Sequence, residues 1–363
     1  MTTTDTPSPS KPADSSRRTA YLVLGMHRSG TSAVTQLLSL AGAQLPKNVM
    51  PADEHNAQGY FEPWRIATFN DERLRAAGSA WDDAFAYPCP ELPEAEADEW
   101  LRRATVLFRE EFAARRYPLI KDPRVTVLLP LWRRVFEAFD LDARCVIPVR
   151  HPLAVAGSLA RRDGFSPQKS VLLWSAYMLA AEAYSRDLPR AFVDYDAMLA
   201  DWRGQAARIE RDHDAPLPKL GKAAARSIDA ALTSELRHNR ADGDLAALGW
   251  TGEIAAAVYA WFVAAARDEP QPASALDDVA QRFSERRGEI GALVSPAARD
   301  LDAARVELLS ARQSLAWEHR ELELLRQELE QTLARMASVQ RDWWAQKGVM
   351  DEAGWALDAI LAG

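Results

Sequence analysis

The chain has 363 residues, 48% of them hydrophobic and 26% charged, which is typical of a soluble globular protein with one large domain or two ordinary ones. Its net charge of −8 gives no general attraction for nucleic acid or anionic membranes, so basic residues that bind a phosphorylated ligand must cluster locally. Neither cysteine, Cys89 or Cys145, belongs to a CxxC or Cys/His cluster, and no run of about 18 uncharged apolar residues occurs. These features argue against a disulfide framework, a metal site and a membrane span, and we expect a cytoplasmic protein.

The chain starts with a Ser/Thr/Pro-rich segment, residues 1–18, which lacks the apolar core of a signal peptide and predicts a disordered tail. YLVLG, residues 21–25, then predicts a short buried strand that ends in glycine. TSAVTQLLSLAG, residues 31–42, predicts a helix that ends at Gly42. A strand, a glycine-bounded loop and a helix, in that order, form the context in which a phosphate-binding loop is expected.

The segments that follow alternate between helices and apolar strands. We expect three more strands near residues 117–121, 144–149 and 190–196, and helices near residues 64–74, 96–115, 125–139, 153–162 and 168–186. Apolar strands that alternate with helices favour a parallel sheet with helices on both faces. The sequence therefore predicts an α/β fold for residues 19–292, a P-loop-like three-layer domain with a parallel sheet flanked by helices.

Residues 293–347 differ in kind, because a large apolar residue recurs there at an unbroken seven-residue interval. That row consists of Leu301, Leu308, Leu315, Leu322, Leu329, Met336 and Trp343. No Gly or Pro interrupts residues 297–347, so we expect one long helix with a coiled-coil pattern, followed by a short C-terminal helix over residues 348–363. The companion heptad positions are mixed, so the helix either packs on its own domain or associates with a second copy through residues 299–346.

The stretch GMHRSGTS, residues 25–32, has the glycine spacing of a phosphate-binding loop. In such a loop, backbone N–H groups and the dipole of the following helix attract an anion. Arg28 adds a planar group whose donors suit phosphate or sulfate. The other candidates for holding the anion are Ser29, Gly30, Thr31 and Ser32. Thr31 stands where nucleotide triphosphatases have lysine, which disfavours metal-assisted transfer of a γ-phosphate.

A second stretch, VIPVRHPLAVAGSLARR, spans residues 146–162. Arg150 leaves the end of a predicted strand, and Ser158 and Arg162 lie on the helix that follows. Because ligands of open α/β sheets bind at the carboxyl ends of the strands, these side chains are candidates for clamping a second phosphate. The alternative is that Arg150 pairs with a neighbouring carboxylate and Ser158 only packs.

Together, the two stretches resemble the sulfotransferases that use 3′-phosphoadenosine-5′-phosphosulfate (PAPS). Those enzymes carry a Lys/Arg-Ser-Gly-Thr-Thr/Ser loop for the 5′-phosphosulfate, and an Arg followed eight residues later by a Ser for the 3′-phosphate. Residues 28–32, Arg150 and Ser158 match this pattern in order and spacing. Arg28 in the loop, with Arg162 four residues after the serine, is more similar to tyrosylprotein and bacterial carbohydrate-type sulfotransferases. The resemblance covers residues 20–200 and implies PAPS as co-substrate, with metal-independent in-line transfer of the sulfuryl group.

The resemblance also implies a general base for the acceptor hydroxyl and a cation at the transferred group. Glu62 in GYFEP precedes a predicted helix, where similar enzymes place a glutamate base, and Glu54 and His55 in DEHN are its competitors. Lys121 in IKDPR matches the catalytic lysine that tyrosylprotein sulfotransferases carry in a Lys-Asp-Pro context. Together with Arg28, it would stabilise charge on the sulfuryl group or the leaving oxygen.

Two other classes of function stay open at this point. A P-loop kinase or NTPase would bind ATP with Mg²⁺, and a coiled-coil scaffold would keep only a vestigial nucleotide site. If the chain is a sulfotransferase, its acceptor is a hydroxyl compound, with a carbohydrate or a lipid-linked sugar as the leading candidates. We expect no nucleic-acid partner.

Overall fold

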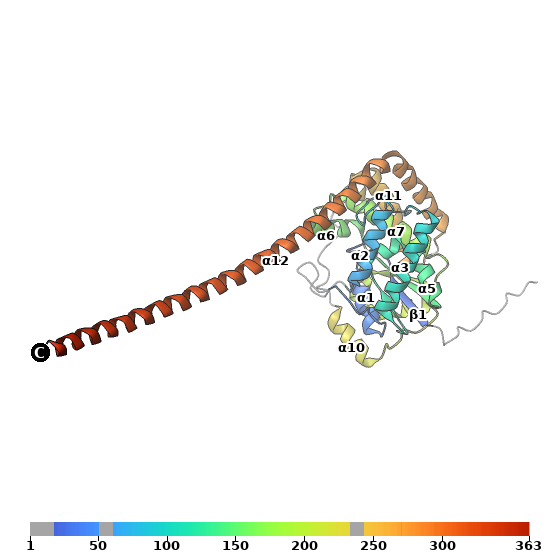
Figure 1. Ribbon diagram of the computed structural model, residues 1–363. Coiled ribbons are helices and arrows are strands. Elements are labelled where there is room, and N and C mark those ends of the chain that lie inside the picture. Colours follow the sequence, from blue (N-terminus) through green and yellow to red (C-terminus); the bar gives the residue numbers. More distant parts are fainter. Residues whose placement is uncertain (1–17, 51–60, 233–242, 270, 363) are drawn as a thin grey trace, which may run out of the picture. The chain divides into compact units, whose positions relative to one another are not determined.

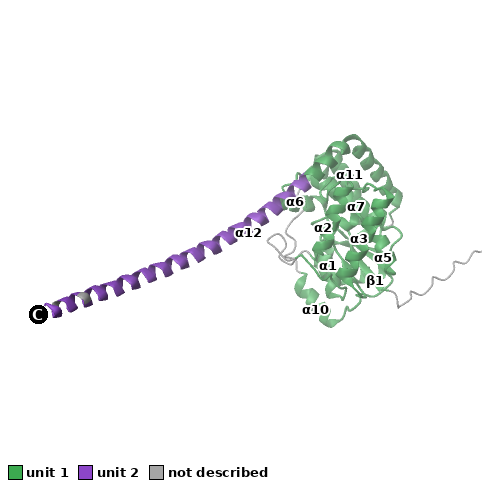
Figure 2. Ribbon diagram, in the orientation of Figure 1, with its two compact units in different colours: residues 1–300 green, residues 301–363 purple. Residues whose placement is uncertain are grey.

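The computed structural model describes residues 18–50, 61–232, 243–269 and 271–362, so nearly all of the predicted tail lies outside the described residues. The chain divides into two compact units, residues 1–300 and 301–363, which we describe one at a time (Figure 2). The strands are β1 (Arg18–Val23), β2 (Leu119–Ile120), β3 (Leu141–Val149) and β4 (Arg190–Asp194). The helices before the last one are α1 (Thr31–Leu40), α2 (Trp64–Ala76), α3 (Glu94–Phe112), α4 (Pro123–Val127), α5 (Leu129–Ala138), α6 (Pro152–Asp163), α7 (Pro167–Tyr184), α8 (Tyr195–Ala200), α9 (Trp202–Asp212), α10 (Lys222–Ala231), η2 (Leu245–Leu248) and α11 (Trp250–Ala266) (Figure 1).

The four strands form one parallel sheet in the order β2-β1-β3-β4. Its register places Tyr21 of β1 beside Leu119 of β2, and Val23 of β1 beside Val146 of β3. Parallel strands need crossover connections, and the chain supplies helices between them. The predicted parallel α/β fold is therefore confirmed, with strand positions close to those expected from the apolar runs.

Two hydrophobic cores lie on the two faces of the sheet. Side chains alternate along each strand, so Leu22 of β1 enters one core while Tyr21 and Val23 enter the other. Helices α2, α3, α5, α6, α7 and α11 supply buried residues to the first core, and α1, α8, α9 and α10 supply them to the second. Because both faces are covered, the strands read as continuous apolar runs rather than as alternating ones.

The helix expected over residues 125–139 is divided into α4 and α5 at Leu128. Asp122 caps α4 by accepting a hydrogen bond from the backbone N–H of Arg124 at 3.2 Å. A proline lies in the first turn of α5, where its missing N–H costs no helical hydrogen bond. The division matters for the site, because it leaves Arg124 on a short, separately capped helix directly after β2.

The last helix, α12, runs from Ala273 to Leu361. It begins well before residue 293, and it does not stop at Gly348, where we expected a second helix to start. A glycine inside a helix costs only about 1 kcal/mol, so Gly348 alone does not end it. The predicted domain boundary at residue 292 stays a prediction. The boundary between the two compact units falls after residue 300. No helix of the described residues is long and apolar enough to cross a membrane.

Candidate functional site

The predicted site residues gather at the carboxyl edge of the sheet because of the strand order. From β1 the chain passes first to β2 on one side and then to β3 on the other, so the strand order reverses at β1. Helix α1, after β1, packs on one face of the sheet, whereas α6, after β3, packs on the opposite face. Such a reversal opens a crevice beyond the strand ends, and this is where α/β proteins bind ligands. The glycine loop follows β1 at this edge of the sheet.

The glycine loop has a backbone path that depends on its glycines. Gly25 has a φ of +133° and donates its N–H to Thr126 Oγ1 at 2.8 Å, which ties the loop to α4. Gly30 has a φ of +92°, and a Cβ at this position would lie 2.3 Å from a ring carbon of Tyr195. Gly30 is therefore required both for its backbone angle and for the close approach of Tyr195. Arg28 also has a positive φ, 68°, an unusual value for a residue with a side chain.

The two motifs that the sequence paired are in direct contact. Arg28 Nε donates to Ser158 Oγ at 2.8 Å, although the two residues are 130 positions apart. Arg150 Nη1 donates to the carbonyl oxygen of Arg28 at 2.9 Å, and its guanidinium lies 4.5 Å from the centre of the Tyr195 ring. Arg28, Arg150 and Ser158 thus form one connected group at the junction of β1, β3 and α6.

The hydroxyl residues of the loop differ in their surroundings. Ser29 is completely buried, and its Oγ makes no hydrogen bond in the described part of the chain. Thr31, at the first position of α1, is 2% exposed, and Ser32 is partly exposed. A buried hydroxyl without a partner is uncommon and is satisfied when a ligand oxygen or water reaches it. Ser29, beside the N-terminus of α1, therefore fits an anionic ligand at this loop.

Arg162 lies one turn after Ser158 on α6 and contacts other residues. Its Nε donates to Asp163 at 2.8 Å, and its guanidinium lies 5.5 Å from the ring centre of Trp81. Trp81 in turn contacts His27 of the glycine loop edge to face, with ring centres 4.9 Å apart. Arg162 was grouped in sequence with the second phosphate clamp, whereas its contacts place it beside the loop on the Trp81 side.

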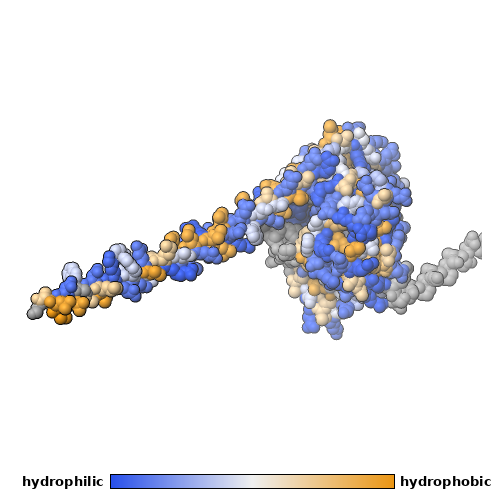
Figure 3. Space-filling model, in the orientation of Figure 1, coloured by the Kyte–Doolittle hydropathy of each residue, from blue (hydrophilic) through white to orange (hydrophobic). Residues whose placement is uncertain are grey.

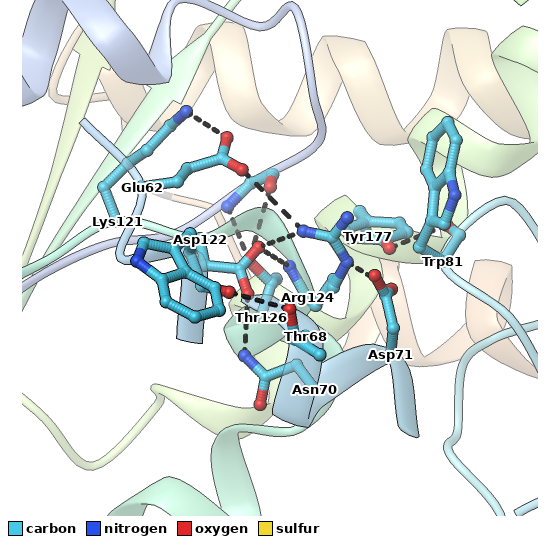
Figure 4. Close-up of polar contacts among 12 residues, drawn as sticks. Glu62, Thr68, Asn70, Asp71, Trp81, Lys121, Asp122, Arg124, Thr126 and Tyr177 are labelled. Atoms are coloured by element: carbon cyan, nitrogen blue, oxygen red, sulfur yellow. Dashed lines mark hydrogen bonds and ion pairs between the residues drawn. The ribbon is translucent and has the colours of Figure 1, made fainter. Parts of the chain in front are cut away.

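Glu62 and Lys121 form a buried ion pair (Figure 4). Lys121 Nζ donates to Glu62 Oε1 at 2.5 Å, and the two side chains are 3% and 4% exposed. Lys121 comes directly after β2, and Glu62 comes just before α2, so the pair joins two segments that are distant in the sequence. The structure thus brings together the predicted base and the predicted cation, a pairing that the sequence did not indicate.

Arg124 extends this pair into a charged network (Figure 4). Its guanidinium contacts Asp71 at 2.5 Å, Asp122 at 2.8 Å and Glu62 at 3.7 Å. Burial by itself would lower the pKa of Arg124, but the three carboxylates outweigh it and hold that pKa well above the usual value. Arg124 therefore stays charged, and the Asp-Pro-Arg sequence was the only local sign of this network.

Asp122 is fixed within the network by Asn70. Asn70 Nδ2 donates to Asp122 Oδ2 at 2.7 Å, and Asn70 Oδ1 accepts from the indole N–H of Trp132 at 3.0 Å. All three side chains are fully buried, so each polar group has a partner away from water. The arrangement holds the segment that carries Lys121 and Arg124 in one position.

The sequence analysis gave no role to His27. It is 7% exposed, and its Nε2 has no hydrogen-bond partner within the described residues. Burial lowers its pKa well below the usual value, and the positive charges of Arg162, Arg124, Lys121 and Arg28 lower it further. The His27 ring, inside the glycine loop, is therefore surrounded by positive charge rather than by carboxylates. Only its place inside the loop could have marked His27 in the sequence.

Two competitors for the base, Glu54 and His55, lie outside the described residues. Within the described ranges, no group of three or more His, Cys, Asp or Glu side chains could hold a metal ion. The carboxylates of Glu62, Asp71 and Asp122 all contact the guanidinium of Arg124.

Comparison with models of protein families and with curated proteins finds no significant match. Among solved structures, the sulfotransferase domain from the Synechococcus PCC 7002 olefin synthase is similar. It is 18% identical, the TM-score is 0.39, and the match covers 69% of this chain and 98% of that chain. A likeness of this size does not establish a shared activity.

Proposed function

We propose that the chain transfers the sulfuryl group of PAPS to a hydroxyl acceptor. The observation that carries this proposal is the contact between Arg28 and Ser158, with Arg150 bound to the backbone of Arg28. It joins the glycine loop to the residues that follow β3, which supports two neighbouring anion sites for a bisphosphorylated nucleotide. A ligand with a single phosphate would need only the first of them.

The residues divide between the two ends of such a ligand. The N-terminus of α1, the buried hydroxyl of Ser29 and the guanidinium of Arg28 suit the 5′-phosphosulfate, because they offer N–H and O–H donors to an anion. Arg150 and Ser158 suit the 3′-phosphate. Arg162, on the same helix as Ser158, adds positive charge to the crevice. When bound, PAPS supplies a sulfuryl group attached to a phosphate that can leave.

Glu62 and Lys121 have the chemistry for the transfer itself. Glu62 is the proposed base that takes the proton of the acceptor hydroxyl, and Lys121 stabilises negative charge on the transferred group. Because an ammonium group has three N–H donors, its bond to Glu62 does not by itself prevent Lys121 from donating to a ligand oxygen. The acceptor that we propose is a carbohydrate or a lipid-linked sugar.

Isothermal titration of the full chain with adenosine 3′,5′-bisphosphate tests the proposal. We expect binding without added metal, and a loss of about 10- to 100-fold in affinity for Arg150→Ala, since a charge-assisted bond to phosphate is lost. Arg102→Ala, which removes an exposed guanidinium bound to Glu99, is the matched control and should bind like the unaltered chain.

Titration with ATP and Mg²⁺ distinguishes the kinase or NTPase alternative. The buried Thr31 at the position of the triphosphatase lysine argues against it. No binding of adenosine 3′,5′-bisphosphate at millimolar concentration, with the variants still folded, would exclude the PAPS site. Tight binding of ATP that depends on Mg²⁺ would favour the alternative instead.

A further inference from the structure

Residues 301–361 carry a row of large apolar side chains that is longer than the sequence analysis recognised. Because α12 continues past Gly348, the seven-residue interval continues with it. The row consists of Leu301, Leu308, Leu315, Leu322, Leu329, Met336, Trp343, Met350 and Leu357, each between 46% and 74% exposed. Figure 3 shows hydrophobic residues recurring along this helix among hydrophilic ones. An exposed apolar row of this length is a surface for another helix.

A second row, three residues further on, completes a heptad pattern. Its members are Ala304, Ala311, Glu318, Leu325, Thr332, Val339, Gln346, Ala353 and Ile360. Apolar residues at the first and fourth positions of a heptad stay on one face when two helices supercoil around each other. Two of its polar members, Thr332 and Gln346, favour one register, because in-register pairing sets each of them against its own counterpart, whereas a slipped pairing would set them against apolar side chains.

The charges beside these two rows indicate which partner fits. The positions that follow the second row are mostly basic, with Arg312, His319, Arg326 and Lys347 among them. Of the eight positions that precede the first row within residues 301–361, four are acidic, namely Glu307, Glu321, Glu328 and Asp342, and one is basic. In an antiparallel pair, acidic positions would face acidic ones and basic positions would face basic ones, which is unfavourable.

In a parallel, in-register pair, an acidic position faces the position five residues further on in the other helix. Glu307 then faces the partner's Arg312, Glu321 faces the partner's Arg326, and Asp342 faces the partner's Lys347. Within one helix Arg326 bonds Glu330 at 3.2 Å, but both side chains are more than 60% exposed and such a pair contributes little. Of the eight contacts of this kind in residues 301–361, these three join opposite charges and none joins like charges.

We propose that residues 301–361 of two copies of this chain form a parallel, in-register, two-stranded coiled coil. The occupant of the apolar surface is a second copy, because one sequence supplies both the acidic and the basic side of each contact. This inference is independent of the proposed enzymatic activity.

Light scattering coupled to size-exclusion chromatography of the full chain tests the proposal. We expect twice the monomer mass of 40.3 kDa. The double variant Leu322→Glu with Leu329→Glu, which puts charge into the apolar row, should have the monomer mass. The matched control is Leu309→Glu with Leu324→Glu, which changes equally exposed leucines outside both rows and should remain a dimer.

Helix direction is tested by Leu308→Cys, near one end of the row, in the otherwise unaltered chain under mild oxidation. An antiparallel pair that overlaps over residues 301–361 would set the two introduced cysteines about 70 Å apart. A parallel, in-register pair brings the two introduced cysteines together, so a covalent dimer should form in high yield. A monomer for the unaltered chain, dissociation of the control variant to the same extent, or a dimer that does not cross-link at this position would overturn the proposal.

Discussion

Replacing Glu62 by Gln and Lys121 by Met, singly and together, measures how strongly the buried ion pair holds the site. The pair has an N–O distance of 2.5 Å, and its side chains are 3% and 4% exposed. Removing one partner of a buried pair leaves an uncompensated charge and typically costs about 3 to 5 kcal/mol of unfolding free energy. The double variant removes both charges, so it should lose clearly less than the sum of the single losses.

Arg124 makes the two single losses unequal. Without Lys121, Glu62 still has the guanidinium of Arg124 at 3.7 Å. Without Glu62, both Lys121 and Arg124 lose a carboxylate partner. We therefore expect Glu62→Gln to lower the unfolding free energy more than Lys121→Met does, with a coupling energy of about 2 kcal/mol or more.

Urea unfolding followed by tryptophan fluorescence gives the four free energies, because buried Trp132 and Trp174 report on the α/β unit. The pair Arg103–Glu72 is a matched control with the same distance of 2.5 Å, but its side chains are 39% and 42% exposed. Its coupling energy should be about 0.2 to 1 kcal/mol. If the Glu62–Lys121 pair couples no more strongly than this exposed pair, the reasoning from burial is wrong.

Two further predictions concern the glycine loop and the dependence of stability on pH. Gly30→Ala should unfold at lower urea and lose binding of adenosine 3′,5′-bisphosphate, because its Cβ would meet the Tyr195 ring. Gly78→Ala, also at positive φ but with nothing within 4 Å of the added carbon, should lose only about 1 kcal/mol and keep binding; equal losses would argue against the close contact. Burial lowers the pKa of His213 to about 4, against about 6.5 when unfolded, so stability is full above pH 6.5 and falls as the pH drops towards 4. His213→Gln should remove about 2 to 3 kcal/mol of the loss between pH 7 and 4.5, measured by urea unfolding; parallel curves for both proteins would contradict this.

Local sequence patterns were enough to predict the strands and the glycine loop. Each strand is an apolar run on a sheet covered on both faces, and Gly25 and Gly30 mark a turn that few other residues can make. The carboxyl-edge location of Arg150 followed from the rule for parallel sheets. The direct bond from Arg28 to Ser158 depends on β3 lying next to β1, a neighbourhood that local patterns do not encode.

The interactions between side chains could not be read from the sequence for the same reason. In the sequence, the carboxylate nearest to Lys121 is that of the adjacent Asp122. Its actual partner, Glu62, comes from a loop before α2, and Asp122 is instead bound by Arg124 and Asn70. Burial decides these pairings, because each charge enclosed between the helices must find an opposite charge or a hydrogen bond.

Thr31 stands where triphosphatase loops have a lysine, and in this chain Lys121, after the neighbouring strand β2, brings an ammonium group to the site. Thr31 is buried, and an ammonium group enters the same region from Lys121 at the end of β2, where its charge helps to lower the pKa of His27. Unlike the lysine of a triphosphatase loop, Lys121 is held by a carboxylate. The positive charge that it offers to an anion therefore depends on the charge of Glu62. If Glu62 takes a proton from the acceptor, less of the charge of Lys121 is offset, and more of it acts on the transferred group. Deprotonation of the acceptor and stabilisation of the sulfuryl group would then be coupled within one pair of side chains.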